Sequence, residues 1–412
     1  MLSRFASVWL LSFTTGIHSG IIRITIGLWL CDCGTHIVYL CLMNLITLPY
    51  CVKFFWMPFL ETHFRPIRRF GHRKSWLIFV EILVILGLVP LIFINPKTVS
   101  FLLLVLYATF LCVLVTTKES IAIAYQMETI KAEKWGASEG KIASGYNLGI
   151  WFSGTLLYLW TDFVRWNTVF SVVILILFSL WFLNFLIPDS NFHSKELGTF
   201  KERFLDQYKE LIVRNRTIIF SLIAFIALYR LQDRILTATG TYFFIDLQFS
   251  KLQIFFGKTL DIFVTILGGF AGSLFVKKFG YKKTLVFGLI IHTFSACLFL
   301  VQSMVPKSYA LFYSIMSIEK MVRGFESTVF FTYQMIFCSK YFITTQLALL
   351  LGLDKLTSSI VGSLSGFIID SVGWTSFFGL SFIGTIPAIL LLKKLPNSIA
   401  QEEKIAEKNL QN

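Results

Sequence analysis

Residues 166–188 read WNTVFSVVILILFSLWFLNFLIP and contain no Asp, Glu, Lys or Arg. A helix needs about 20 apolar residues to cross the hydrocarbon core of a bilayer, and this run is that long. Four further charge-free runs of this kind occupy residues 98–117, 142–161, 284–306 and 371–392. Seven runs interrupted by charge lie around residues 5–29, 35–58, 76–95, 216–242, 253–276, 309–337 and 345–369. Together these runs predict twelve membrane-spanning helices.

The composition of the whole chain agrees with a membrane protein. Of the 412 residues, 56% are hydrophobic and only 15% are charged, and the mean hydropathy is +0.72. Soluble domains carry about 25% charged residues. Lipid cannot satisfy a free backbone amide, and the apolar runs lack the strict alternation of barrel strands. The sequence therefore predicts an all-α integral membrane protein.

The basic residues are distributed unevenly between the links that join these runs. One set of alternate links holds 22 Lys and Arg, in residues 63–74, 131–141, 195–216, 277–283 and after 392. The intervening links hold four, namely Lys97, Arg165, Lys251 and Lys307. By the positive-inside rule the basic set is cytoplasmic, so we expect both termini in the cytoplasm and an even number of spans. Membrane topology thus explains the net charge of +14, and we expect no nucleic-acid partner and no cleavable signal peptide.

A polar segment divides the runs into two sets of six. We expect a six-helix bundle over residues 1–188, a cytoplasmic linker over 189–216, a second six-helix bundle over 217–395 and a cytoplasmic tail over 396–412. Within the linker, Phe204, Tyr208, Leu211 and Ile212 are spaced to form one apolar helical stripe. The linker is therefore either an amphipathic helix on the cytoplasmic surface or a solvated connection with some helix.

Two basic links show a trace of internal duplication. FLETHFRPIRRFGHRKSW follows the second run, and GSLFVKKFGYKKTL follows the eighth. Both resemble the loop motif Gly-x-Leu-x-Asp-Arg-x-Gly-Arg-Lys of the major facilitator superfamily, with Glu61 at the acidic position of the first copy and Val276 or Lys277 at that of the second. The resemblance implies the facilitator fold, with twelve helices in two six-helix halves. Basic links that only enforce topology are the alternative interpretation.

Charges also occur inside the apolar runs, most densely in SIEKMVRGFE at 317–326. Glu319, Arg323 and Glu326 are spaced i, i+4 and i+7 and share a helical face. The embedded charges concentrate in the first and fourth runs of each half, and in the facilitator fold these runs line a central cavity. The residues concerned are Arg23, Glu119, Arg230, Asp233, Arg234, Glu319, Lys320, Arg323 and Glu326. Because a charge at the bilayer centre is costly, this set indicates either a polar permeation path or ion pairs that join helices.

The seven cysteines and six histidines do not suggest an enzyme. Cys31 and Cys33 lie close together, but no further Cys or His stands at ligand spacing, so we expect no metal site. The chain also lacks a His-Glu-x-x-His or similar hydrolytic signature. We expect a protein without catalytic activity.

Several stretches resemble the AmpG muropeptide permease family. LITLPYCVKFFWMPFLETHFRPIRRFGHRKSWL (45–77) is similar to the hallmark of its second span, with Lys53, Phe54, Trp56 and Pro58 matching. GYNLGIWFSG (145–154), LYRLQD (228–233) and TTQLALL (344–350) are similar to later patches in the same order. The resemblance implies a monomeric, multi-pass protein of the bacterial cytoplasmic membrane. It would import N-acetylglucosaminyl-1,6-anhydro-N-acetylmuramyl species, with or without peptide, for cell-wall recycling.

The resemblance also implies a set of functional residues. Sugar rings suit aromatic side chains and peptide carboxylates suit basic ones. The expected substrate-binding residues are Arg23, Lys53, Tyr125, Tyr229, Arg230, Asp233, Lys258 and Arg323. Transport would be driven by protons, with no other cofactor. A carboxylic acid in a low-dielectric cavity can load and release a proton, and the candidates are Glu119, Glu319 and Glu326.

The fourth run departs from the family pattern. The family shows a second acid where this chain has Ile123, and a basic residue is common where Gln126 and Asn147 stand. These differences indicate a divergent paralogue with an altered substrate or coupling. The alternative function is a facilitator for another anionic solute, such as a nucleotide, an acyl-CoA or a sugar phosphate, because embedded Arg and Lys also suit phosphate.

Overall fold

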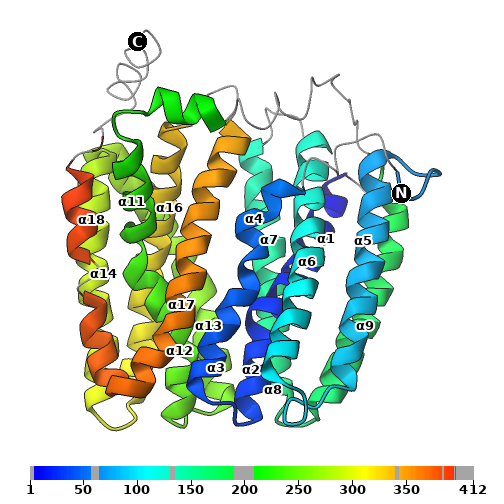
Figure 1. Ribbon diagram of the computed structural model, residues 1–412, viewed down its shortest axis with the longest axis horizontal. Coiled ribbons are helices and arrows are strands. Elements are labelled where there is room, and N and C mark those ends of the chain that lie inside the picture. Colours follow the sequence, from blue (N-terminus) through cyan, green and yellow to red (C-terminus); the bar gives the residue numbers. More distant parts are fainter. Residues whose placement is uncertain are drawn as a thin grey trace. The chain divides into compact units, whose positions relative to one another are not determined.

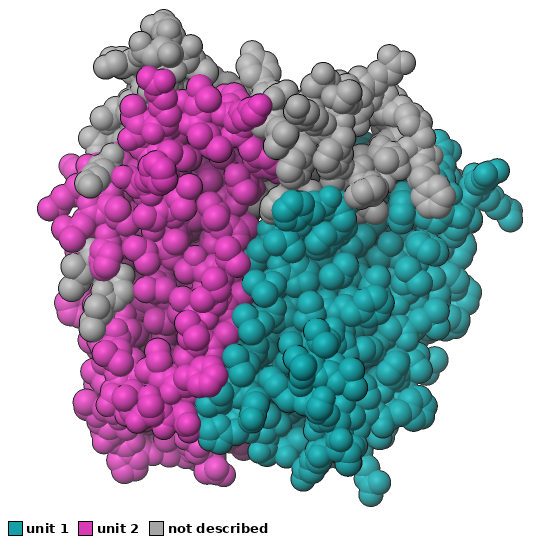
Figure 2. Space-filling view, in the orientation of Figure 1, with its two compact units in different colours: residues 1–197 teal, residues 198–412 magenta. Residues whose placement is uncertain are grey.

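The computed structural model describes residues 4–56, 65–129, 135–189, 208–338, 343–382, 385–393 and 395. These residues form helices joined by short turns, and none of them lies in a strand, which confirms the all-α prediction. The chain divides into two compact units, residues 1–197 and 198–412, coloured separately in Figure 2. The predicted bundle boundaries stay predictions.

Unit 1 is built from helices that follow one another closely in the chain (Figure 1). They are α1 (Arg4–Gly20), η1 (Ile21–Thr25), α2 (Ile26–Asp32), α3 (Ile37–Leu42), η2 (Met43–Thr47), α4 (Pro49–Val52), η3 (Lys53–Phe55), α5 (His72–Leu88), η5 (Val89–Ile92), α6 (Phe101–Thr129), α7 (Trp135–Trp151), η7 (Phe152–Leu156), α8 (Leu157–Trp160), α9 (Trp166–Leu183) and η8 (Asn184–Leu186). The segments η1 and η7 are π-helical turns, so α1 runs on into α2, and α7 into α8.

Glycines allow α1 and α7 to pack with their backbones in close approach. A Cβ atom on Gly16 would lie 2.1 Å from the carbonyl oxygen of Tyr146, and one on Gly149 would lie 2.2 Å from that of Phe13. Small residues at membrane helix interfaces permit this approach. Near the seam, the Thr25 hydroxyl in η1 donates to the carbonyl of Ser153 in η7 at 2.7 Å.

Unit 2 begins in its described part with a short helix, Tyr208–Arg214. It continues with α11 (Ile219–Tyr229), α12 (Leu231–Asp246), α13 (Lys251–Phe279), α14 (Tyr281–Met304), α15 (Tyr309–Ser314), the π-helical η9 (Ile315–Glu319), α16 (Lys320–Ile336), α17 (Ile343–Ser381) and α18 (Thr385–Leu392). Gly280 (φ 78°) separates α13 from α14, and Gly373 (φ 76°) breaks α17. Glycine suits both breaks because other residues are strained at such φ values.

Unit 2 has its own glycine seam, between α13 and α16. A Cβ atom on Gly268 would lie 1.9 Å from the carbonyl oxygen of Met321, and one on Gly324 would lie 2.0 Å from that of Thr265. The start of α13 is fixed by a capping box, in which Ser250 and Gln253 each accept the other's backbone N–H.

Six described helices are long and apolar enough to cross a membrane, or seven if the bent pair Tyr208–Arg214 and Ile219–Asp246 counts as one span. The spans predicted around 5–29, 142–161 and 309–337 are each divided by a π-helical turn, and their longest helical segments have 17 residues. The prediction of twelve spans therefore stays a prediction. On α6, Leu102, Leu103 and Phe110 are more than half exposed, which is typical of a lipid-facing surface.

The helical part of the predicted linker lies across one end of unit 2 (Figure 1). The helix Tyr208–Arg214 is bent by 105° from the helix that follows it. Leu211 is buried in the core of unit 2, whereas Ile212 is 51% exposed. Phe204 lies outside the described residues. Of these two described residues of the predicted stripe, Leu211 enters the core and Ile212 does not. Contact of the helix with a membrane surface stays a prediction.

Candidate functional site

Asp233 is the centre of an ionic cluster in unit 2. Its carboxylate is fully buried and lies 2.6 Å from the guanidinium of Arg230 and 3.0 Å from that of Arg323. Arg234 approaches the same carboxylate at 3.7 Å and forms a short ion pair with Asp354 of α17. Arg230 stands at the break between α11 and α12, so Asp233 lies in the first turn of α12. Asp233 joins α12 to α16 through Arg323, and Arg234 joins α12 to α17 through Asp354.

Arg323 and Glu326 of SIEKMVRGFE pair with residues of neighbouring helices, whereas Glu319 and Lys320 pair with each other. Arg323 reaches across to α12, where it contacts Asp233 and donates a 2.5 Å hydrogen bond to Thr237. Glu319, the last residue of η9, pairs with the adjacent Lys320 at 2.8 Å. Glu326 lies 2.7 Å from the Nδ1 atom of His292 on α14. Arg323 thus forms its ion pair with a carboxylate on a neighbouring helix, and it also interacts electrostatically with Glu319.

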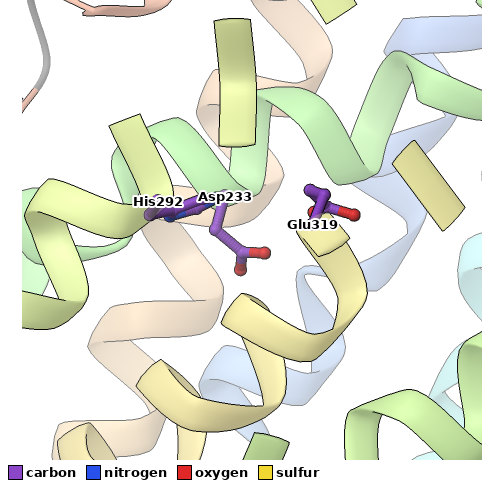
Figure 3. A group of neighbouring side chains, drawn as sticks. All are labelled: Asp233, His292 and Glu319. Carbon is purple, nitrogen blue, oxygen red and sulfur yellow. The ribbon is translucent and has the colours of Figure 1, made fainter. Parts of the chain in front are cut away.

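His292, Asp233 and Glu319 come together from three helices (Figure 3). One potential ligand atom from each lies within 4.8 Å of the others, and all three residues are buried. Four basic side chains, Arg230, Arg234, Arg323 and Lys320, already form ion pairs within this cluster. Their positive charge disfavours a metal cation at this position.

The cluster presents its basic groups outward. The side chains of Asp233, Glu319 and Glu326 are 0% exposed, whereas that of Arg323 is 20% exposed. Arg230 and Arg234 are each 11% exposed. A solute that reaches this region would meet guanidinium groups before it met any of these three carboxylates, and guanidinium groups bind carboxylate and phosphate in bidentate fashion.

Lys258, half-buried on α13, belongs to the same region. Its ammonium group interacts electrostatically with Asp261 one turn away and with Lys320 and Arg323 of α16. Asp261 in turn accepts a 2.9 Å hydrogen bond from Thr265. The structure therefore brings together Arg230, Asp233, Lys258, Glu319, Arg323 and Glu326 of the predicted site residues.

A second ionic cluster lies inside unit 1, and the sequence reading did not identify it. The ammonium group of Lys118 on α6 lies 2.8 Å from the carboxylate of Glu81 on α5 and 2.9 Å from the hydroxyl of Thr14 on α1. His18 of α1 lies 3.1 Å from the same ammonium group and 3.5 Å from Glu81. The three ionisable side chains are at most 1% exposed. This cluster joins α1, α5 and α6.

The predicted residues Arg23 and Glu119 lie in a neighbouring, more accessible group. Ser19 donates to Glu119 at 3.2 Å and lies 3.2 Å from the hydroxyl of Tyr50. Arg23, an exposed residue in η1, interacts electrostatically with Glu119, Tyr50 and Tyr146. Adjacent residues thus belong to two groups, because His18 and Lys118 form the first cluster while Ser19, which is buried, and Glu119, which is half-buried, contact each other in the second.

The remaining predicted site residues lie elsewhere. Lys53 is half-buried, with its ammonium group 6.0 Å from the ring centroid of Tyr50. Tyr125 is fully buried and donates to the carbonyl of Pro188. Tyr229 is 2% exposed, stacks on Phe330 and donates to the carbonyl of Leu285. Packing thus occupies both tyrosines in this structure, and their role in sugar binding stays a prediction.

The structure also shows the exposure and contacts of the positions that depart from the family pattern. Ile123 is 43% exposed, and Asn147 is exposed on α7. Gln126 is buried and donates to Ser12 of α1 at 2.8 Å. In the first turn of α5, Arg73 pairs with Glu128 of α6 at 2.8 Å. Glu61, the residue predicted for the acidic position of this loop motif, lies outside the described residues.

Histidine and lysine were the signals that sequence reading overlooked. An ionisable residue within a span is a candidate functional residue whatever its sign. His18 and His292 lie within predicted runs, and Lys118 directly follows the run 98–117.

The sequence of the chain was compared with protein families and with known proteins. The family model described as Major Facilitator Superfamily matches residues 8–363. A protein named putative transporter AmpG 2 from Rickettsia felis is 29% identical over 401 residues, which cover 96% of each chain. The anhydromuropeptide permease of Escherichia coli is 23% identical over 393 residues, covering 94% of this chain and 79% of that protein. These similarities confirm the resemblance to AmpG permeases predicted from the sequence.

Solved structures of low identity share the fold. The nucleoside transporter NupG superposes with a TM-score of 0.70 at 11% identity, covering 95% of this chain and 98% of that one. The D-xylose-proton symporter gives a TM-score of 0.70 at 15% identity, covering 95% and 97%. The facilitator fold predicted from the basic links is therefore confirmed.

Proposed function

Because the chain belongs to the Major Facilitator Superfamily and is a multi-pass membrane protein, we propose that it imports anhydro-muropeptides across a bacterial cytoplasmic membrane by proton symport. The substrates would be N-acetylglucosaminyl-1,6-anhydro-N-acetylmuramyl species, with or without peptide, and the import would serve cell-wall recycling. The names of its relatives support the substrate class. The protein would act as a monomer with both termini in the cytoplasm.

The observation that carries this proposal is the outward presentation of basic groups over buried acids in unit 2. Arg323, Arg230 and Arg234 are the more accessible members of the cluster, and the carboxylates of Asp233, Glu319 and Glu326 lie beneath them. A muropeptide presents carboxylates that suit such guanidinium groups. The buried acids supply groups able to exchange protons during transport.

The test is uptake of labelled anhydro-muropeptide into proteoliposomes that contain the purified protein. We expect accumulation when a proton gradient is imposed and equilibration only when a protonophore collapses it. Empty liposomes and liposomes with an Arg323→Ala protein serve as controls. Failure of the wild-type protein to accumulate or bind the labelled sugar would contradict the proposed substrate.

Competition experiments address the alternative of another anionic solute. We expect unlabelled anhydro-muropeptide to inhibit uptake and a nucleotide, an acyl-CoA or a sugar phosphate to have little effect at the same concentration. Strong transport of one of these compounds without transport of the muropeptide would favour the alternative.

Reporter fusions at Lys97 and Lys307 test the predicted topology. They should score as external, because these links carry few basic residues.

A further inference from the structure

His292 differs from the other members of the unit 2 cluster because its charge can change near neutral pH. It projects from α14 among three carboxylates, namely Glu326 at 2.7 Å and, within 4.8 Å of a ring nitrogen, Asp233 and Glu319. Its other ring nitrogen, Nε2, is buried without a hydrogen-bond partner among the described residues. An imidazole in these surroundings has both a place for a second proton and carboxylates to balance it.

One added proton changes the net charge of the cluster. Among the described residues, the ion-paired members are four bases and four acids: Arg230, Arg234, Arg323 and Lys320, with Asp233, Asp354, Glu319 and Glu326. Lys258 and Asp261 add one charge of each sign. With a neutral imidazole the cluster is balanced, and one added proton leaves it with a net charge of +1. The balance is the same wherever the proton resides within the His292–Glu326 pair.

We propose that the His292–Glu326 pair binds the proton that accompanies an anionic solute, and that this proton supplies the positive charge the solute neutralises. The inference rests on the proposed uptake of an anionic solute by proton symport, and it adds His292 to the three carboxylates considered from the sequence. Protonated His292 takes over part of the charge of Asp233 and Glu319. Arg323 and Arg230, which now face Asp233, are then available to the solute.

The groups that face the pair come from every helix packed around it. Asp233 of α12 and Glu319 of η9 act on His292, and Arg230 and Tyr229 act on Glu326. Glu326 has no Lys or Arg within ion-pair distance in the described part of the chain, in contrast to Glu319 and Asp233. Among the three carboxylates around His292, the charge of Glu326 is thus the one that a proton, rather than a fixed cation, compensates.

The unit 1 cluster provides an internal contrast. There, Glu81 is compensated by the permanent ammonium group of Lys118, which also lies 3.1 Å from His18. A second positive charge on His18 would have no carboxylate left to balance it. His18 is therefore the matched control for His292, since both histidines are buried beside a glutamate.

The proton site can be tested without any ligand. Protein labelled with ¹⁵N-histidine is reconstituted in lipid nanodiscs, and the ring nitrogen signals are followed between about pH 5 and 8, where histidine titrates. We expect one buried histidine signal to titrate, to be absent from the His292→Gln protein and to shift in the Glu326→Gln protein. The His18→Gln protein should keep it. A His292 signal that does not change over this range would overturn the proposal.

The coupling to ligand is tested by calorimetry in two buffers of different ionisation enthalpy. We expect wild-type protein to take up a proton on binding anhydro-muropeptide, so that its Kd rises by up to about tenfold per pH unit in alkaline solution. The His292→Gln protein should bind without proton uptake. Binding by wild-type protein without proton uptake would overturn this inference and leave the substrate assignment intact. Absence of binding would instead contradict the proposed function. The NMR titration of His292 needs no ligand, so it would still test whether the His292–Glu326 pair binds a proton.

Discussion

The two units carry the same hydrogen bond at one end and opposite charge arrangements in their interiors. In unit 1, the indole of Trp166 donates to Asp32 at 3.1 Å, and these residues begin α9 and end α2. In unit 2, the indole of Trp374 donates to Asp246 at 2.9 Å, joining the segment after the Gly373 break to the end of α12. The bond occupies equivalent positions in the two sets of helices.

The interiors use equivalent helices with the signs of the charges exchanged. In unit 1, the bases His18 and Lys118 on α1 and α6 meet the acid Glu81 on α5. In unit 2, the acids Asp233 and Glu326 on α12 and α16 meet the base His292 on α14. The two units thus share the Trp–Asp hydrogen bond and differ in the signs of their buried charges. The comparison suggests a structural role for the sealed unit 1 cluster and a solute-facing role for the unit 2 cluster.

The sharpest way to test this division is to break the unit 1 cluster. Lys118→Met should leave Glu81 buried with only His18 nearby, and removing one partner of a buried ion pair costs about 3–5 kcal/mol. We expect a large fall in the thermal unfolding temperature of the purified protein. The double variant Glu81→Gln, Lys118→Met should recover most of the loss, because no uncompensated charge remains. A double variant as unstable as the single one would contradict a role for the ion pair.

The corresponding change in unit 2 should affect ligand binding more than stability. Arg323→Ala removes the most exposed guanidinium of the cluster, and a hydrogen bond to a charged group is worth about 1.5–3 kcal/mol. We therefore expect the Kd for anhydro-muropeptide to rise about ten- to a hundredfold. Arg323→Lys should fall between wild type and Ala, because it keeps the charge but loses the bidentate geometry. Unchanged affinity in the Ala protein would assign Arg323 to structure alone.

An ion pair of this site could be predicted from the sequence only where its two residues are close together in the chain. Arg230 and Asp233 are only three residues apart, so their pairing is accessible from local spacing. Arg323 and Asp233 are far apart in the chain, so local spacing, which placed Arg323 on one helical face with Glu319 and Glu326, could not identify this partner. The choice among several acids within reach of a long side chain is made by the packing of neighbouring helices.

The fold was more accessible to sequence reasoning than the site. Apolar runs such as 166–188 are governed by the thickness of a bilayer, which is the same for every membrane helix. The π-helical turns at η1, η7 and η9 were not predicted; IIRIT in η1 and IMSIE in η9 contain neither Gly nor Pro, and FSGTL in η7 contains a single glycine. The duplicated Trp–Asp bond was also missed, since each residue is unremarkable alone.

A second comparison concerns the close helix packing at glycines, which joins α1 to α7 in unit 1 and α13 to α16 in unit 2. Gly16→Ala should force α1 away from α7, and Gly268→Ala should force α13 away from α16, since each Cβ would meet a carbonyl oxygen at 2.1 Å or less. Overpacking of this kind costs about 1–3 kcal/mol. Gly379→Ala is the control, because its Cβ would meet nothing within 4 Å. Thermal unfolding should separate both seam variants from the control, and equal stability of all three would contradict close packing.

The shared hydrogen bonds should give the smallest effects, and effects of similar size in the two units. Trp166→Phe and Trp374→Phe each keep an aromatic ring but remove the indole donor to Asp32 or Asp246, so each should cost about 1 kcal/mol of stability. Asp32 also accepts a 3.4 Å hydrogen bond from Tyr158, which partly compensates the loss in unit 1. We therefore expect the Trp374→Phe protein to unfold at a slightly lower temperature than the Trp166→Phe protein, with both retaining ligand affinity. A large loss of affinity for anhydro-muropeptide in either variant would show that the Trp–Asp hydrogen bond also affects the geometry of the solute site.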